Sequence, residues 1–215
     1  MVAHAVARSF ADDESSFRVQ EMQHRVANSL QIVASLLMQS ARKTASEEAR
    51  LNLLDAHGRV IAIAAVQRRL AHSDTDDVDL RGYFDLLCEG LSDALIGDPA
   101  RQSIVVDVDD VRVEADAAVN LGLIATELII NAIKHAFPGG RSGRITVRYR
   151  ASGQGWSLTV ADDGVGMPAT RMRATPGLGT NIIEALARHL HANTVRLDGP
   201  SGATVSIIHR PTSPA

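Results

Sequence analysis

One predicted helix carries polar groups at spacings that could hold a metal ion and phosphates. In Thr126–Ala136, Asn131 follows Glu127 by four residues, and Lys134 and His135 follow Asn131 by three and four. These steps place the side chains on one face of an α-helix. The segment is otherwise apolar, so this face is expected to be buried, where polar groups need partners. A Mg²⁺–triphosphate would satisfy them; loop backbone at the helix end is the alternative.

Two glycine-containing segments follow further along the chain. Asp162, Gly164 and Gly166 come directly after an apolar, strand-like run. A carboxylate there could accept a hydrogen bond from an adenine amino group, and the glycines let the backbone come close. Gly177 and Gly179 precede another helix, and the free N–H groups of a helix start can bind phosphate. Each pattern alone also fits an ordinary turn.

Three further residues are assigned to the same site. Arg171 and Arg173 lie between the two glycine segments and could close on phosphates, although exposed loop arginines are the simpler interpretation. Thr204 lies in Gly202–Thr204, before the final predicted strand. The sequence contains no GxxxxGK[ST] pattern, so the site is not a P-loop.

A histidine far upstream could accept a phosphoryl group. Glu21, His24 and Asn28 lie on a polar stripe of the first predicted helix. Imidazole is largely neutral near pH 7, so its free nitrogen can attack phosphorus. A solvated surface histidine is the alternative interpretation.

Taken together and in this order, the segments resemble a known family. Residues 126–136, 162–166 and 177–181 resemble the N, G1 and G2 boxes of the GHKL superfamily of ATP-binding domains. Residues 21–31 read Glu-Met-Gln-His-Arg-Val-Ala-Asn-Ser-Leu-Gln and resemble the phosphoacceptor motif of the HRxxN histidine kinases, the second HisKA-type subfamily. The related HWE pattern needs a tryptophan that the segment 181–186 lacks.

The resemblance implies ATP and Mg²⁺ as cofactors and assigns roles within the N box. Asn131 would coordinate Mg²⁺, and Glu127 would orient a magnesium-bound water or help to activate the phosphoacceptor. Lys134 would approach the phosphates, and His135 would lie near the nucleotide. The other implied nucleotide contacts are Asp162, Gly164, Gly166, Arg171, Arg173, Gly177, Gly179 and Thr204.

The resemblance also assigns roles around the phosphoacceptor. Arg25 follows His24 where commoner histidine kinases have an acidic residue. The base that acts on His24 is therefore either Glu21, one turn earlier, or the protein supplies no base at all. Asn28 would position a water that dephosphorylates the response regulator, so phosphatase activity is a further expectation.

The expected fold class is α+β. Residues 1–16 are expected to form a flexible N-terminus, and 17–72 an antiparallel helical hairpin that carries His24. Two hairpins would form a dimeric four-helix bundle, because two helices alone cannot cover both apolar stripes. An acidic linker is expected at 73–79, and 80–210 should form a two-layer α/β sandwich with three helices on one face of a mixed sheet, followed by a tail at 211–215.

Composition sets the remaining limits. The chain has 215 residues, of which 45% are hydrophobic and only 3% aromatic, so aliphatic side chains must fill the core. The net charge of −3 argues against a nucleic-acid partner. The single cysteine, Cys88, fits a reducing compartment and a buried position. The sequence has no secretory signal and no uninterrupted apolar run of about 18 residues, so we expect a cytoplasmic protein without a membrane span.

These observations predict a soluble, homodimeric histidine kinase core. It would phosphorylate His24 from Mg-ATP and pass the phosphoryl group to an aspartate of a response-regulator receiver domain. Its ATP domain would swing over the linker to reach His24, and its input would come from a separate sensory protein. Two alternatives stay open: a phosphotransfer or phosphatase protein with a vestigial ATP domain, and a non-catalytic regulator with a nucleotide-gated binding surface.

Overall fold

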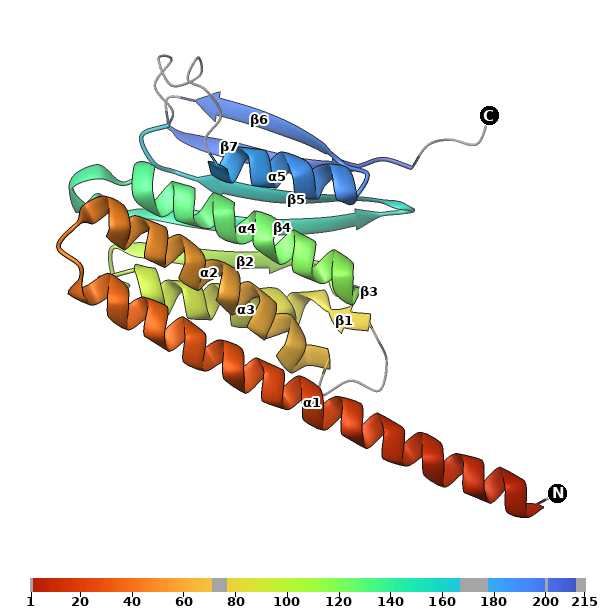
Figure 1. The fold of residues 1–215 in the computed structure, drawn as a ribbon. Coiled ribbons are helices and arrows are strands. Elements are labelled where there is room, and N and C mark those ends of the chain that lie inside the picture. Colours follow the sequence, from red (N-terminus) through yellow and green to blue (C-terminus); the bar gives the residue numbers. More distant parts are fainter. Residues whose placement is uncertain (1, 71–76, 167–177, 200, 212–215) are drawn as a thin grey trace.

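Two long helices open the chain (Figure 1). In the computed structural model, which describes residues 2–70, 77–166, 178–199 and 201–211, α1 spans Val2–Lys43 and α2 spans Glu47–Leu70. The helix expected to start near Phe17 therefore begins at Val2, and the segment expected as a flexible N-terminus is helical from that residue. The physical reason is that no glycine or proline occurs before Gly58, so nothing interrupts the helix.

The two helices pack closely through small residues. Ala27, Ala34 and Ala41, seven residues apart, are buried, and they are the buried side chains among those that the structure describes in α1. The carbonyl oxygen of Ala34 lies 3.0 Å from Nδ1 of the buried His57 on α2. Ser46 caps α2, because its hydroxyl accepts a hydrogen bond from the backbone N–H of Ala49 at 3.2 Å. The expected hairpin is therefore present.

The last residues of the predicted linker form part of a two-stranded sheet. β1 (Asp77–Asp79) pairs antiparallel with β3 (Arg112–Glu114). Residues 77–79 are therefore a strand, and residues 71–76 of the expected linker lie outside the described residues. The reason is that Val78 is buried, whereas its two sequence neighbours, Asp77 and Asp79, are not. The alternation of a strand sends that one apolar side chain into the core.

The main sheet has five strands and is mixed. Its order is β2-β4-β5-β7-β6, with β2 parallel to β4 and the other neighbours antiparallel. The strands span Gln102–Val108 (β2), Gly143–Ser152 (β4), Gly155–Asp162 (β5), Asn193–Gly199 (β6) and Gly202–His209 (β7). A short 3₁₀ helix, η1 (Pro138–Gly140), precedes β4.

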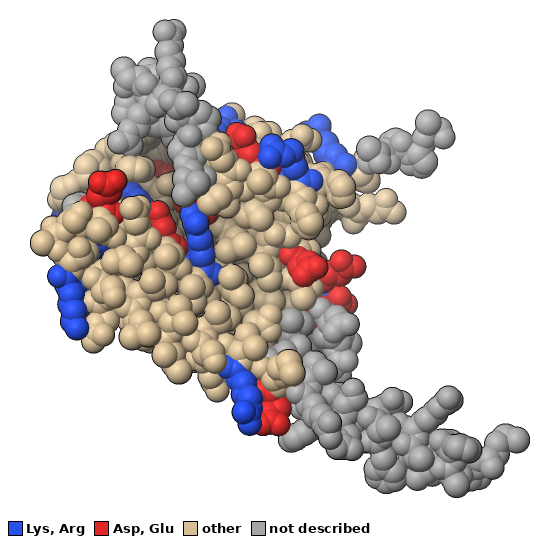
Figure 2. Space-filling view, viewed as in Figure 1, with Lys and Arg blue, Asp and Glu red and all other residues tan. Residues whose placement is uncertain are grey.

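Three helices cover one face of this sheet, as predicted: α3 (Leu80–Leu95), α4 (Ala115–His135) and α5 (Leu178–His189). Along β4, Ile145 and Val147 are buried beneath the helices, whereas Arg144 and Arg148 are exposed on the other face. Charged side chains of both signs are scattered over the molecular face drawn in Figure 2.

The central helix is α4. Its length and hydropathy alone would allow it to cross a membrane, but 61% of its most apolar window is buried inside the protein. Ile124 and Ile129 are among its fully buried side chains. This helix is therefore the core helix of the α/β layer.

The hairpin and the α/β layer share one core. Ala62, Ala65 and Val66 of α2 belong to the same buried cluster as residues of α3 and α4. The hydroxyl of Tyr83 on α3 donates to the backbone oxygen of Ala62 at 3.2 Å, and it lies where Gly122 of α4 has no side chain. Part of the apolar surface of α2 is therefore covered within the chain by α3 and α4.

Replacing Gly122 by alanine should test this three-helix junction. The new Cβ would overlap the Tyr83 hydroxyl, which would displace the ring and break its bond to α2. We expect Gly122→Ala to lower the free energy of unfolding by about 2 kcal/mol, despite the better helix propensity of alanine. Urea denaturation measures the change. The control is Gly97→Ala, because Gly97 has no atom within 4 Å of its added Cβ; equal stability of the two variants would contradict the junction.

Candidate active site

The polar face of α4 was expected to be buried, but the structure buries only one of its four polar residues, Glu127. Glu127 is buried, with only 5% of its surface exposed, whereas Asn131 is exposed and Lys134 is half-buried. His135 is exposed at the carboxyl end of the helix. The face therefore runs from the protein interior to the surface within two helical turns.

The partners of the buried charges come from α2. Arg59 Nε donates to Glu127 Oε1 at 2.6 Å, and Lys134 Nζ donates to Asp55 Oδ1 at 2.7 Å. The sequence prediction missed both partners. The available signal was Gly58, because an isolated glycine inside a long helix often marks close packing; Asp55 and Arg59 lie on either side of it.

The start of α5 lies against the same face of α4. A Cβ placed on Gly179 would lie 2.8 Å from Oε2 of Glu127 and 3.9 Å from Nδ2 of Asn131. The structure therefore brings this residue of the G2 box next to the N box. Arg171, Arg173 and Gly177 lie outside the described residues.

The G1 segment is fixed by Asp162. Its Oδ1 accepts hydrogen bonds from the backbone N–H of Gly164 at 3.0 Å and of Ala203 at 3.3 Å. A side chain on Gly164 would overlap Ala136 at the end of α4. Gly166 has φ +69°, and a Cβ there would overlap the carbonyl oxygen of Gly199. The segment therefore requires glycines, as predicted.

Thr204 is a predicted site residue that the structure does not bring to the polar face of α4. The register pairs it with Ala161 of β5 and Leu197 of β6. Because strand side chains alternate between faces, Thr204 lies on the sheet face away from the helices. Ala203, its neighbour, donates to Asp162 instead.

The phosphoacceptor candidate lies in α1. His24 is a residue of this helix, and its side chain is not among those described. Arg25 contacts Glu21 through its guanidinium, with Nη2 2.7 Å from Oε1 and Nε 3.1 Å from the same atom. Asn28, one turn after His24, is exposed. The candidate base Glu21 is therefore engaged in an ion pair.

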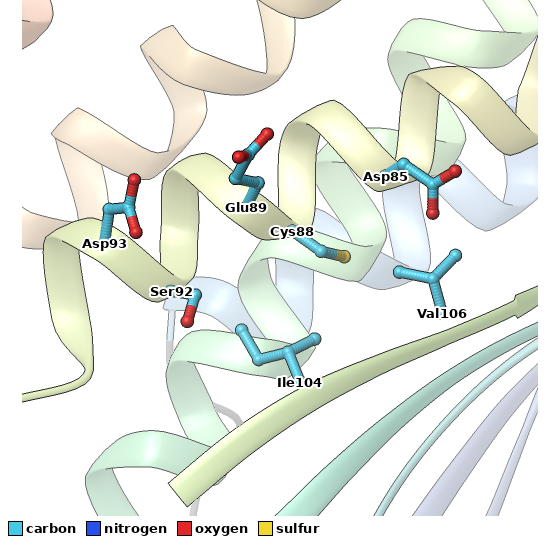
Figure 3. Close-up of a pocket in the computed structure, with 7 residues that line it drawn as sticks. All are labelled: Asp85, Cys88, Glu89, Ser92, Asp93, Ile104 and Val106. Atoms are coloured by element: carbon cyan, nitrogen blue, oxygen red, sulfur yellow. The ribbon is translucent and has the colours of Figure 1, made fainter. Parts of the chain in front are cut away.

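A hollow lies between α3 and β2 (Figure 3). It measures about 340 Å³ and is lined by three carboxylates and four other residues: Asp85, Cys88, Glu89, Ser92, Asp93, Ile104 and Val106. The carboxylates would repel a triphosphate. Among the described residues, no three His, Cys, Asp or Glu side chains gather closely enough to hold a metal ion. Burial raises the pKa of the Cys88 thiol to about 12, so it stays protonated.

Two family models match this chain and between them span nearly all of it. The HisKA_2 model, described as histidine kinase, matches residues 21–95. A model described as histidine kinase-like ATPase domain matches residues 98–209. The N and G1 boxes and Gly179 lie inside the second match, and such an ATPase domain implies ATP binding.

Individual proteins agree with the family models. The sensor histidine kinase PdtaS of Mycobacterium tuberculosis is 34% identical over 187 residues, which cover 86% of this chain and 36% of the relative. Blue-light-activated histidine kinase 2 of Erythrobacter litoralis is 28% identical over 194 residues, covering 87% of this chain and 55% of the relative. The chain thus spans about a third to a half of these relatives.

A solved structure shows the same arrangement of elements. The histidine kinase domain of the Erythrobacter litoralis EL346 blue-light-activated kinase superposes with a TM-score of 0.65 and is 26% identical. The superposition covers 91% of this chain and 94% of that domain. The α+β fold, with a helical region followed by an ATPase domain of the GHKL type, is therefore confirmed.

Two glycine substitutions should separate backbone strain from the packing of the G1 segment. Gly166→Ala and Gly153→Ala both place alanine at positive φ, +69° and +58° respectively, which costs about 1 kcal/mol. Only the Gly166 variant also meets another backbone, because Gly153 has no atom within 4 Å of its added Cβ. We expect Gly153→Ala to keep ATP affinity and Gly166→Ala to lose it, as titration calorimetry can measure. Equal affinities would contradict the role of G1.

Proposed function

Since the chain belongs to the histidine kinase family, we propose that it phosphorylates itself on His24 from Mg-ATP. The phosphoryl group then passes to an aspartate of a separate response-regulator receiver domain. The observation that carries the proposal is the convergence of three distant segments at one end of α4. Gly179 lies beside Glu127 and Asn131, and Gly164 lies against Ala136 at the carboxyl end of the same helix, in a chain that also carries an HRxxN histidine.

The residues at this end of α4 fit a magnesium-bound nucleotide. The exposed amide of Asn131 supplies an oxygen ligand of the type that Mg²⁺ prefers. Gly179, lacking a side chain, leaves room beside that amide and the second oxygen of Glu127. Lys134 supplies a positive charge for the phosphates. When bound, Mg²⁺ neutralises charge on the phosphate oxygens.

The adenine end of the nucleotide is assigned to the G1 segment. Asp162 Oδ1 is already used by two backbone N–H groups. Its other carboxylate oxygen has no hydrogen bond among those described, so we assign the adenine amino group to it. The fixed loop holds that carboxylate in place before the base arrives.

The transfer to His24 follows the chemistry of a neutral imidazole. A ring nitrogen attacks the γ-phosphorus, a P–N bond forms, the bond to the β,γ-bridging oxygen breaks, and ADP leaves. The ring proton goes to solvent, because Glu21 is paired with Arg25. Positioning and charge neutralisation carry most of the rate enhancement in such reactions.

Dephosphorylation of the receiver is the second activity that we propose. Asn28 is exposed one turn after His24, so its amide could position a water against a receiver docked on α1. We place the reaction in the cytoplasm, where receivers and ATP occur together. Input from a separate sensory protein stays a prediction.

Labelling with γ-³²P ATP tests the kinase proposal. We expect acid-labile, base-stable label on the wild type and none on His24→Ala, because His24 is the proposed acceptor. Asn131→Ala should also lose the label, through loss of the metal ligand, whereas His24→Ala should bind ATP normally. The matched control is His189→Ala, an exposed histidine on α5.

The other outcomes separate the rival functions. Nucleotide binding without label on the wild type would favour a phosphotransfer or phosphatase protein. Absence of both would indicate a domain that no longer uses ATP. Label that persists in His24→Ala would place the acceptor elsewhere.

We also propose that two copies pair through α1. Met22, Val26, Val33 and Leu36 are exposed and follow one another at steps of four, seven and three residues. Such steps form a stripe that fits a second helix of the same kind. Another side of α1 is already packed on α2 through its alanines, and part of α2 is covered by α3 and α4. A second copy would therefore be held mainly by α1.

A charge within this stripe should separate the copies. Leu36→Glu places a carboxylate where α1 would meet the second copy, so we expect a monomer in analytical ultracentrifugation and a dimer for the wild type. The matched control is Leu197→Glu, because Leu197 is also an exposed leucine but lies on β6. A wild type that sediments as a monomer would overturn the pairing.

A further inference from the structure

One edge of the main sheet has no strand beside it among the described residues. β2 comes first in the order β2-β4-β5-β7-β6, so β4 is its only described neighbour in the sheet. Every second residue of a strand directs its N–H and C=O groups to the same side, so an edge strand offers part of its backbone to another chain. Within the described part of the chain, the backbone of residues 103–106 hydrogen-bonds to no segment other than β4. We call the other side of this strand the free edge of β2.

β2 lacks the features that usually protect such an edge. It is seven residues long and contains neither lysine nor proline. Its one charged residue, Asp107, is held by Arg148 and Arg150 of β4. The strand at the opposite end of the sheet, β6, carries an exposed charge, Arg196. Of the two edges, the free edge of β2 is therefore the one that suits pairing with a further strand.

The helix beside this edge carries a row of acids. Asp85, Glu89 and Asp93 on α3 are exposed and follow one another at steps of four residues, which places them along one side of the helix. None of the three forms an ion pair with another described residue. Arg81, the one basic residue of α3, is paired with Asp110 instead. We call these three carboxylates the acidic row, and its negative charge is not neutralised within the described structure.

The hollow of Figure 3 joins the acidic row to the free edge. Ile104 and Val106 line it from β2, and the acidic row lines it from α3. In Figure 3, Ser92 lies towards Ile104 and Asp85 lies towards Val106, so the helix and the strand run alongside each other in opposite directions. A strand added to the free edge would therefore place every second side chain on the face of the sheet that α3 covers, next to the hollow.

The spacing of the acidic row matches the spacing of such side chains. Four residues of an α-helix rise about 6 Å, and two residues of a strand span about 6.6 Å. Three basic side chains at alternate positions could therefore each reach one carboxylate, with their aliphatic stems over Ile104 and Val106. The intervening side chains would lie on the other face beside Val105, which is 39% exposed. Apolar side chains fit there.

We propose that the free edge of β2 binds an extended segment of a partner protein as an additional strand, in which basic residues alternate with apolar ones. Backbone hydrogen bonds to β2 hold the segment, and the acidic row selects its basic side chains. A second copy of this chain does not fit, because pairing two β2 edges would bring two acidic rows together. A metal ion does not fit either, since no three acidic side chains among the described residues gather closely enough to hold one.

A labelled peptide tests this surface on the full chain. The probe is a fluorescein-labelled heptapeptide of four lysines alternating with three valines, and binding is measured by fluorescence anisotropy. We expect saturable binding of this peptide and none of a peptide with glutamate in place of lysine. Replacing the acidic row by Asp85→Asn, Glu89→Gln and Asp93→Asn should weaken the affinity about tenfold, as expected for the loss of three exposed ion pairs.

The matched control removes the same amount of charge elsewhere. Three exposed acids on other helices are replaced by Glu48→Gln, Asp116→Asn and Glu184→Gln, and this variant should keep the affinity of the wild type. Salt gives a second measurement that needs no substitution. Raising the salt concentration should weaken peptide binding to the wild type, because exposed charges are screened, and should change the affinity of the acidic-row variant less.

Two further peptides test the added strand. A peptide of the same composition with its four lysines contiguous keeps the charge but loses the alternation, so it should bind about tenfold more weakly. The alternating peptide with every backbone nitrogen methylated keeps the side chains but cannot donate hydrogen bonds to β2, so it should not bind.

Several results would overturn the proposal. These are absence of binding to the wild type, equal affinity of the wild type and the acidic-row variant, and unchanged binding of the methylated peptide. The last result would show a contact between charges without an added strand. None of the seven residues that line the hollow belongs to the assigned nucleotide site, so any of these results would leave the labelling of His24 unaffected. Failure of this proposal is thereby distinguished from failure of the kinase proposal.

Discussion

The buried carboxylate of Glu127 is the constraint on which the arrangement of this protein depends. A charge with so little exposure must be paired, and removing its partner typically costs about 3–5 kcal/mol. Arg59 supplies the pair at 2.6 Å, which requires α2 to lie against α4. The second oxygen faces Gly179, where a larger side chain would not fit. One carboxylate thus links the hairpin, the N box and the G2 box.

Small residues make this close assembly possible in a chain with 3% aromatic residues. Alanines let α1 approach α2, Gly58 lets α2 approach α4, and Gly122 leaves room for Tyr83 between three helices. Packing of this kind depends on matched shapes, because bulky side chains are not available to fill gaps. The same matching gives the ATP-binding layer a defined position on the hairpin, and that position is distant from the phosphoacceptor.

Local patterns in the sequence predicted much of the fold and part of the site. Hydrophobic periodicity predicted the hairpin, α3 and the strands. The spacing from Glu127 to Lys134 predicted that these polar residues share one face of a helix. The pairing of Asp55 with Lys134 could not be predicted, because ion pairs between distant segments leave no local pattern. Thr204 was assigned to the site from its place in Gly202–Thr204. The sheet face on which it lies could not be predicted, because that face depends on the strand register, and a shift of one residue would move every side chain to the other face. The sequence did not predict that α1 begins at Val2, because its first turns have no apolar stripe and only helix propensity favours a helix there.

The proposed phosphorylation of His24 requires the ATP-binding layer to swing away from α2. The most direct measurement of this movement is the distance between spin labels on α1 and α5, at Gln31→Cys and Glu184→Cys in a Cys88→Ala background, both exposed positions. With Mg²⁺ and a non-hydrolysable ATP analogue, the distance distribution should gain a second population that is absent without nucleotide. A single distribution that stays unchanged at saturating nucleotide would contradict the claim.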